Sequence, residues 1–314
     1  MGLRISGFSP SHQRGILLSN LGTPDAPGFW AVRRYLKEFL SDPKVIDLPR
    51  WKWLPILNLI ILNIRPFKSA HNYRKIWMRE GSPLLVWSQR IADQLQAALP
   101  DLPLALGMSY GKPSLANAEA TLKAQGVTDI IRLALYPQYS QTTGGMSYHD
   151  HPLYIKALKN SVETHWAMHG RQEKLILSYH GLPERYIEQG DPYLDQCKET
   201  TDLLAKALGL QANAYIMCFQ SRVGREKWLE PYTDKILLDL PQMGVKRVDV
   251  LCPGFACDCL ETLEEINIRY REFFMRSGGE IFQYIPCLND SFDQIRLLME
   301  LCKTAYRDGH SKKL

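Results

Sequence analysis

Carboxylate side chains gather in one stretch of the sequence, CPGFACDCLETLEEI at residues 252–266. After a Pro-Gly turn this stretch is predicted to form a helix, on which Glu261 and Glu265 stand four residues apart on one face. Glu264 lies beside them, and Asp258 precedes the helix. Like charges at this spacing destabilise a helix by roughly 0.2–0.5 kcal/mol. A row of carboxylates kept despite this cost favours a functional role, such as guiding cations or protons. An acidic first turn that complements the helix dipole is the alternative.

A histidine occupies the end of an expected strand in the stretch SYHGLPERYIEQGDPY, residues 178–193. His180 could act there as a base or a metal ligand near neutral pH, and a solvated loop histidine is the alternative. Residues 136–143 and 219–233 place Tyr, Ser, Gln and Trp at other strand ends, where they suit the walls of a site for a flat aromatic ligand. The sequence contains neither of the common glycine-rich phosphate-loop motifs.

Short apolar runs that alternate with helical patterns must position these side chains. Such alternation predicts an α/β fold with parallel strands. The expected strands are residues 15–20, 104–110, 130–137, 174–180, 214–220, 247–254 and 281–286. The two halves repeat the same order, which predicts two similar doubly wound, Rossmann-like domains. Ligands of such folds bind at the carboxyl ends of the strands, where the histidine and the carboxylates both lie.

The domain boundaries follow from this repeat. Residues 1–145 together with 289–314 are predicted to form the first domain, and residues 146–288 the second, which carries His180 and Glu261. A last helix at about 290–306 begins after Asn, Asp and Ser residues that suit a helix N-cap. We expect this helix to return across the first domain.

Residues 51–68, WKWLPILNLIILNIRPFK, stand apart from the repeat. The helical pattern puts apolar positions 56, 57, 60, 61 and 64 on one face. The run is too short to span a membrane, which takes about 20 apolar residues. Its tryptophans and flanking Lys and Arg residues are typical of an interfacial helix, so we predict an apolar lip that could contact a membrane surface. An ordinary core helix is the equal alternative.

Composition limits the class of protein. The chain has 314 residues and a formal net charge of +5, an excess too small to indicate nucleic acid binding. The N-terminus shows no signal peptide, and the 7 cysteines are therefore expected to be free thiols in a reducing cytoplasm. Cys252, Cys257 and Cys259 lack CxxC spacing, which favours buried thiols over a metal cluster.

An ordered set of motifs resembles the ferrochelatase family: NLGTPD, GSPLL, YPQYS, SYHGLPERY, FQSRVG, CPGF with DCLETLEEI, and YIPCLN. The resemblance covers roughly residues 15–305 and implies a chelatase-like fold. It also implies a lyase of heme biosynthesis that inserts ferrous iron into protoporphyrin IX. The family's active-site histidine falls on His180 and its glutamate on Glu261, and metal-binding positions fall on these two, Asp258 and Glu265. Positions that contact the porphyrin fall on Leu21, Tyr73, Ser82, Tyr136, Ser221, Trp228 and Phe255.

The chemistry implied by the resemblance is metalation of a distorted macrocycle. Distortion exposes the pyrrole nitrogens, His180 accepts a pyrrole proton, and Glu261 relays a proton or the metal. The sequence does not decide which of the two meets iron first. A coproporphyrin ferrochelatase, a cobalt chelatase and a non-catalytic tetrapyrrole-binding protein are the alternatives.

Several positions depart from the family pattern. Ser109 replaces an arginine found before the tyrosine at 110 in many relatives. Gln141 replaces a cysteine of the relatives that hold a [2Fe–2S] cluster, and the chain ends at HSKKL without their cysteine-bearing extension. We therefore expect no such cluster and no permanently bound cofactor. Only about ten residues separate Gln141 from Pro152, where the family usually has a helix and a strand. Either the fourth strand of the first domain is missing, or part of this loop is absent from this sequence.

Overall fold

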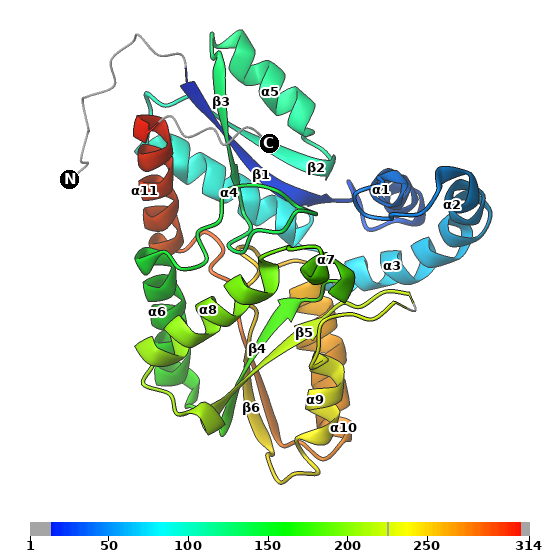
Figure 1. Ribbon diagram of the computed structural model, residues 1–314, viewed down its shortest axis with the longest axis vertical. Coiled ribbons are helices and arrows are strands. Elements are labelled where there is room, and N and C mark those ends of the chain that lie inside the picture. Colours follow the sequence, from blue (N-terminus) through cyan, green and yellow to red (C-terminus); the bar gives the residue numbers. More distant parts are fainter. Residues whose placement is uncertain (1–13, 225, 309–314) are drawn as a thin grey trace.

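Two parallel β-sheets form the centre of the computed structural model, which describes residues 14–224 and 226–308 (Figure 1). Two predictions fall outside these residues: the absence of a signal peptide, which concerned residues 1–15, of which only Arg14 and Gly15 are described, and the HSKKL terminus. The strands are β1 (Arg14–Thr23), β2 (Leu104–Gly111), β3 (Asp129–Ala134), β4 (Lys174–His180), β5 (Tyr215–Gln220), β6 (Arg247–Leu251) and β7 (Ile281–Ile285). Each lies within or close to a predicted strand, because these apolar runs are buried on both faces of a parallel sheet.

The two sheets repeat one topology. The first has the order β2-β1-β3 and the second β5-β4-β6-β7, with all strands parallel. Strands β1, β2 and β3 thus correspond to β4, β5 and β6, while β7 has no counterpart among the described residues. A loop occupies residues 135–151, where a helix and a fourth strand would need to fit. In the described part of the chain the first sheet is therefore one strand shorter than the second.

Helices cover both sheets and link them. They are α1 (Phe29–Ser41), α2 (Arg50–Ile56), η1 (Leu57–Ile61), α3 (Leu62–Ile76), α4 (Pro83–Ala98), α5 (Leu115–Ala124), α6 (Pro152–His169), α7 (Glu184–Glu188), α8 (Tyr193–Ala207), η2 (Ala212–Ala214), α9 (Thr233–Asp239), η3 (Leu260–Tyr270), α10 (Arg271–Arg276) and α11 (Phe292–Asp308). Helix α11 returns to the first sheet as expected: it packs against α4 and β1, and Arg14 donates to the Tyr306 carbonyl (Figure 1). One apolar cluster joins buried side chains of both sheets with α11.

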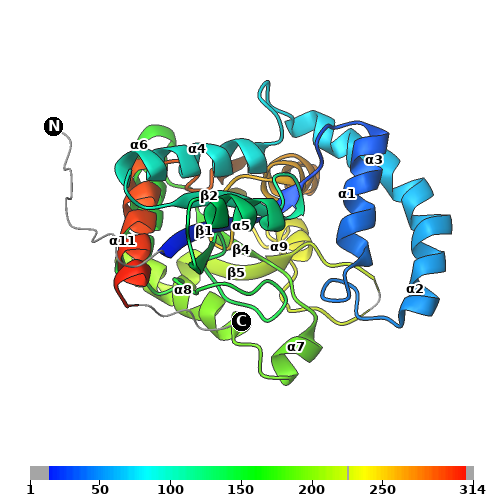
Figure 2. The ribbon, with the colours of Figure 1, turned by 90° about the horizontal axis from the view of Figure 1, so that it is seen from above.

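The apolar lip, residues 51–68, belongs to a helical segment that projects to one side with α1 (Figure 2). Its five predicted apolar positions do not share one environment. Leu57 is fully buried against α1 and α3, whereas Ile60 is 52% and Ile64 67% exposed. Pro66 lies within α3 and has no N–H, and Arg33 of α1 donates instead to the carbonyl of Leu62 at 3.2 Å. The lip is therefore half core and half exposed apolar surface.

Candidate functional site

His180 is the last residue of β4 and pairs in register with Gln220, the last residue of β5. The Nδ1 atom of His180 lies 2.6 Å from the carbonyl oxygen of Gly181. A carbonyl can only accept, so Nδ1 carries a proton, and in the neutral imidazole the lone pair is on Nε2. Tyr193 fixes the backbone by donating to the His180 carbonyl at 2.9 Å. This arrangement orients the imidazole as a proton acceptor at a strand end.

Aromatic side chains stand around the histidine. The ring of Phe255, from the turn after β6, is centred 6.3 Å from that of His180. Trp228 packs over Gly181, where an added Cβ would lie 3.1 Å from the indole and 2.8 Å from the Gln220 carbonyl oxygen. Position 181 therefore needs glycine, because any larger residue would push the histidine turn away from Trp228. Both aromatic residues are half-buried, which suits contact with a flat ligand.

Glu261 lies near the start of η3, beyond the end of β6, which pairs with β4. The side chain of Gln220 donates to the Glu261 carbonyl at 2.8 Å, so this glutamine connects the histidine strand to the glutamate helix. Burial and then the charge of Glu261 raise the pKa of Tyr73, on α3, above its usual range. Within the described residues no Lys or Arg forms an ion pair with Glu261, unlike Glu264 and Glu265.

Helix η3 is a π-helix over its whole length, not the α-helix that the predicted i,i+4 stack implies. Its backbone hydrogen bonds run from i to i+5, a geometry that is frequent at functional sites. The wider turn separates the three glutamates: Glu264 and Glu265 are buried, and Glu261 is half-buried. The expected single row of carboxylates is thus replaced by three groups in different surroundings.

Asp258 is buried at the start of η3 and accepts hydrogen bonds from three other segments. Tyr284 donates to its Oδ1 at 2.5 Å, Thr262 to the same oxygen at 3.0 Å, and Asn289 to Oδ2 at 2.7 Å. The Asp258 amide in turn donates to the Asn289 side chain at 2.8 Å. The carboxylate therefore ties the helix that carries Glu261 to β7 and to the turn before α11.

Glu265 is engaged by the loop after β5. Its carboxylate accepts from the Ser221 amide at 3.1 Å, from the Ser221 hydroxyl at 2.6 Å and from the Tyr270 hydroxyl at 2.7 Å. Ser221 has a φ of 68°, a left-handed conformation that is uncommon for residues other than glycine. Glu265, predicted to bind the metal, and Ser221, predicted to contact the porphyrin, are therefore hydrogen-bonded to each other.

Two cations already neutralise the outer part of this helix. Lys75 of α3 and Arg269 each lie 3.3 Å from an oxygen of the buried Glu264, and Arg269 is also 3.8 Å from Glu265. A buried carboxylate needs such partners, and a metal ion would have to compete with them.

Substitution of Arg269 tests this neutralisation. We expect Arg269→Ala to lower stability, because it removes one partner of a buried ion pair, and to let a divalent cation bind at Glu264 and Glu265. Added Mn²⁺ should then raise the melting temperature of the variant but not that of the wild-type protein. A variant whose melting temperature ignores Mn²⁺ would show that these carboxylates form no outer metal site.

The other residues assigned to the porphyrin line the same ends of the first sheet. Leu21 is half-buried in β1, and Ser82, before α4, accepts from the Thr23 hydroxyl at 2.6 Å. Burial raises the pKa of Tyr136, after β3, above its usual range. Leu21 lies two residues before the end of β1, Ser82 bonds to the last residue of that strand, and Tyr136 follows β3, so these three positions lie at the carboxyl end of the first sheet.

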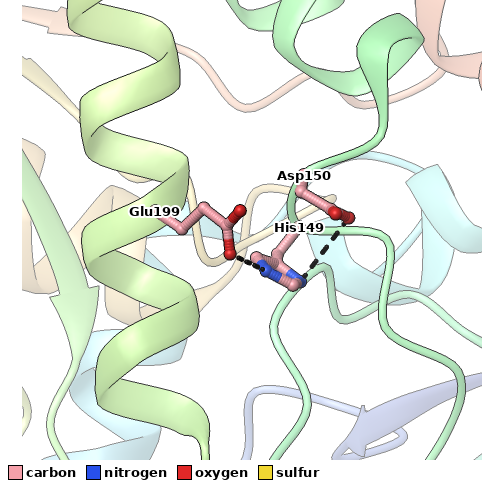
Figure 3. A group of neighbouring side chains, drawn as sticks. All are labelled: His149, Asp150 and Glu199. Carbon is pink, nitrogen blue, oxygen red and sulfur yellow. Dashed lines mark hydrogen bonds and ion pairs between the residues drawn. The ribbon is translucent and has the colours of Figure 1, made fainter.

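A different group has the closest spacing of metal-binding side chains. Among residues 14–224 and 226–308, one set of three offers ligand atoms within 4.8 Å of one another: His149, Asp150 and Glu199 (Figure 3). Glu199 lies 3.0 Å from Nε2 of His149, while Asp150 lies 3.8 Å from Nδ1 and the Ser147 hydroxyl 2.7 Å from it. Because the acids approach opposite nitrogens that are already hydrogen-bonded, the group serves as a clamp between the 135–151 loop and α8.

The cysteines lie inside the protein. All seven are free thiols and buried, as predicted. Burial raises the pKa of Cys252 well above its usual range and that of Cys257 to about 12. Neutral buried thiols are poor metal ligands.

This chain is similar to known proteins over most of its length. A family model described as Ferrochelatase matches residues 13–147 and 145–306. Ferrochelatase 1 of Shewanella oneidensis is 51% identical, covering 92% of this chain and 95% of that protein. The ferrochelatase of Vibrio cholerae is 50% identical, covering 92% and 97%. The solved sirohydrochlorin chelatase SirB from Bacillus subtilis subspecies spizizenii, in complex with cobalt, has a TM-score of 0.54 at 10% identity, covering 95% of this chain and 97% of that one, which shows the fold alone.

The family match crosses both sheets and includes the strand ends that carry His180 and Glu261. Relatives with half of their aligned residues identical cover nearly the whole chain. The chain belongs to the ferrochelatase family.

Proposed function

We propose that this ferrochelatase, a lyase of heme biosynthesis, inserts ferrous iron into protoporphyrin IX with His180 as the acceptor of a pyrrole proton. The observation that carries the proposal is the Nδ1–Gly181 hydrogen bond, which leaves the basic Nε2 for a substrate. Metalation replaces two pyrrole protons by one Fe²⁺ ion. His180 takes up one of these protons, and Glu261 provides the charge that guides the other proton or the metal.

The remaining polar residues position these two groups. Gln220 holds the Glu261 backbone beside the histidine strand, and Asp258 anchors the start of η3. We assign Asp258 and Glu265 to this supporting role, since their oxygens already accept hydrogen bonds from neighbouring residues. Glu261, which forms no ion pair with any described Lys or Arg, is the carboxylate that we propose to meet the metal.

An anaerobic assay tests the function itself. The purified protein is mixed with Fe²⁺ and either protoporphyrin IX or coproporphyrin, and the Soret band is followed. We expect turnover with protoporphyrin IX, faster than with coproporphyrin and faster than with Co²⁺ as the metal. Faster turnover with coproporphyrin or Co²⁺ would show that the enzyme is a coproporphyrin ferrochelatase or a cobalt chelatase instead. A shifted Soret band without turnover would indicate a tetrapyrrole-binding protein.

We further propose that the apolar lip contacts a membrane surface from the cytoplasmic side. No helix in residues 14–224 and 226–308 is long and apolar enough to cross a bilayer. Exposed apolar side chains nevertheless occur on α1, α2, η1 and α3. The rings of Phe29, on α1, and Phe67, on α3, are in contact, with their centres 4.4 Å apart. The members of this surface are Trp30, Trp51, Ile56, Leu59, Ile60, Ile64 and Phe67. Flanking basic residues such as Lys52 suit anionic lipid headgroups.

Two exposed positions of the lip give the sharpest test of membrane contact. Ile60→Glu with Ile64→Glu should reduce co-sedimentation with anionic liposomes by about ten-fold or more, because each buried isoleucine contributes roughly 1.5–3 kcal/mol. Met243→Glu, at a residue that is 76% exposed elsewhere, is the matched control and should bind as wild type does. Equal binding of all three proteins would contradict the lip.

We also propose that the protein holds no iron–sulfur cluster and no permanently bound cofactor. The support is Gln141 together with the burial of every cysteine. Iron and sulfide analysis of anaerobically purified, heme-free protein tests this, and matching amounts of both would contradict it.

A further inference from the structure

Two histidines lie one helical turn apart near the amino end of β4, at the opposite end of that strand from His180. His165 and His169 occupy the last turns of α6, which leads into the amino end of β4, whereas His180 occupies its carboxyl end. The two imidazole rings are centred 4.6 Å apart and tilted by 44°. Histidines at i and i+4 present two nitrogens to one ion, as in helical zinc motifs.

Hydrogen bonding fixes the tautomer of His165. Gln283 of β7 donates its amide to the His169 carbonyl at 3.1 Å, so its oxygen faces the Nε2 atom of His165 at 2.9 Å. That oxygen can only accept, hence Nε2 is protonated and the lone pair of the neutral ring is on Nδ1. Metal-binding histidines usually donate their second N–H to an oxygen in this way. Within the described part of the chain, the ring of His169 makes no hydrogen bond.

A buried acidic residue lies next to this pair of histidines. Asp249 is paired with Gln283 in the parallel register of β6 and β7, and it is fully buried. Its Oδ2 accepts from the Trp166 indole at 2.7 Å and from the Gln172 amide at 3.0 Å, while its Oδ1 has no hydrogen-bond partner among the described residues. Burial raises the pKa of Asp249, and the hydrogen bonds from Gln172 and Trp166 oppose that rise. A buried acid therefore lies on the strand beside Gln283, the residue that orients His165.

We propose that His165 and His169 form a second site for a divalent transition metal, distinct from the metalation cleft. His165 binds through Nδ1, His169 supplies the second imidazole, and water completes the coordination. Two metal–nitrogen bonds of about 2.0–2.1 Å that meet at a tetrahedral angle place the two ligand nitrogens roughly 3.3 Å apart. Because the two imidazole rings are centred 4.6 Å apart, small rotations of the rings bring their nitrogens to this separation. Imidazole ligands select ions such as Ni²⁺, Cu²⁺ and Zn²⁺ over Mg²⁺ and Ca²⁺.

Calorimetric titration of tag-free protein with Ni²⁺ tests the site. Wild-type protein should bind one more equivalent of Ni²⁺ than His169→Ala does. In Gln283→Ala the affinity for this additional Ni²⁺ ion should fall by about ten-fold to a hundred-fold. His149→Ala removes the histidine of the other three-residue group and should leave the equivalent unchanged. Porphyrin metalation by His169→Ala should stay within two-fold of wild type, since the pair lies away from the cleft.

Three results would overturn this proposal. They are an unchanged Ni²⁺ titration in His169→Ala, loss of the equivalent in His149→Ala, and an unaltered affinity in Gln283→Ala. Because porphyrin metalation is measured separately, failure of this site leaves the proposed enzyme function intact, and failure of that function leaves the metal titration interpretable.

Discussion

His180→Ala should reduce iron insertion by about 10²–10⁴-fold, the usual consequence of losing a general base. Porphyrin should still bind, because Phe255 and Trp228 remain in place beside the vacated position. The two effects are measured separately, by Soret absorption for metalation and by quenching of protein fluorescence for porphyrin binding. His169→Ala, at a histidine remote from the cleft, is the matched control and should retain activity. A His180→Ala protein that metalates porphyrin within a few-fold of wild type would rule out this histidine as the base.

Asp258→Ala should cost about 3 kcal/mol of unfolding free energy, because the substitution leaves several buried donors without an acceptor. The donors are the Tyr284 and Thr262 hydroxyls and the Asn289 amide. Urea unfolding measures the loss. Glu272→Ala removes an exposed acid from α10, the helix that follows η3, and should change stability by no more than about 0.5 kcal/mol.

This pair of variants also separates two roles for Asp258. If the residue were chiefly a metal ligand, its replacement would lower iron insertion and leave stability near that of Glu272→Ala. A supporting role predicts that stability falls and that activity falls with it, because the carboxylate no longer accepts the hydrogen bond from the Asn289 side chain that ties the start of η3 to the turn before α11. Unchanged stability in Asp258→Ala would contradict the supporting role.

Strand positions could be predicted from the sequence because parallel strands buried on both faces consist of short, nearly continuous apolar runs. The same reasoning placed His180 at a strand end and Glu261 on the helix after β6, where both are found. Their common edge follows from the topology of doubly wound folds, since the carboxyl ends of parallel strands meet there.

The partners of the carboxylates could not be predicted in this way. A π-helix has no recognisable sequence pattern, so the division of Glu261, Glu264 and Glu265 among different surroundings was missed. Lys75 lies 189 residues from its partner Glu264, and no local spacing relates them. Contacts of this kind depend on how α3 packs against η3, which is decided by tertiary structure.

Gln220 is the supporting residue that sequence reasoning passed over, although a signal existed. It is a polar residue at the end of an apolar strand and is almost fully buried, with its oxygen accepting from Ser178 at 2.8 Å. Buried polar side chains need partners, so a glutamine in that position indicates a hydrogen-bond network. Its amide supplies the link to the Glu261 backbone.

The pH dependence of a single turnover tests the role of His180 most directly. Wild-type enzyme with porphyrin already bound is mixed anaerobically with excess Fe²⁺ in stopped flow, so that binding and product release do not limit the signal. The rate of metalation should rise with pH, since only the neutral ring has a lone pair on Nε2 that can accept a pyrrole proton. The residual rate of His180→Ala should lack this rise. A wild-type rate that does not change with pH, or a variant that keeps the wild-type profile, would contradict proton transfer to His180.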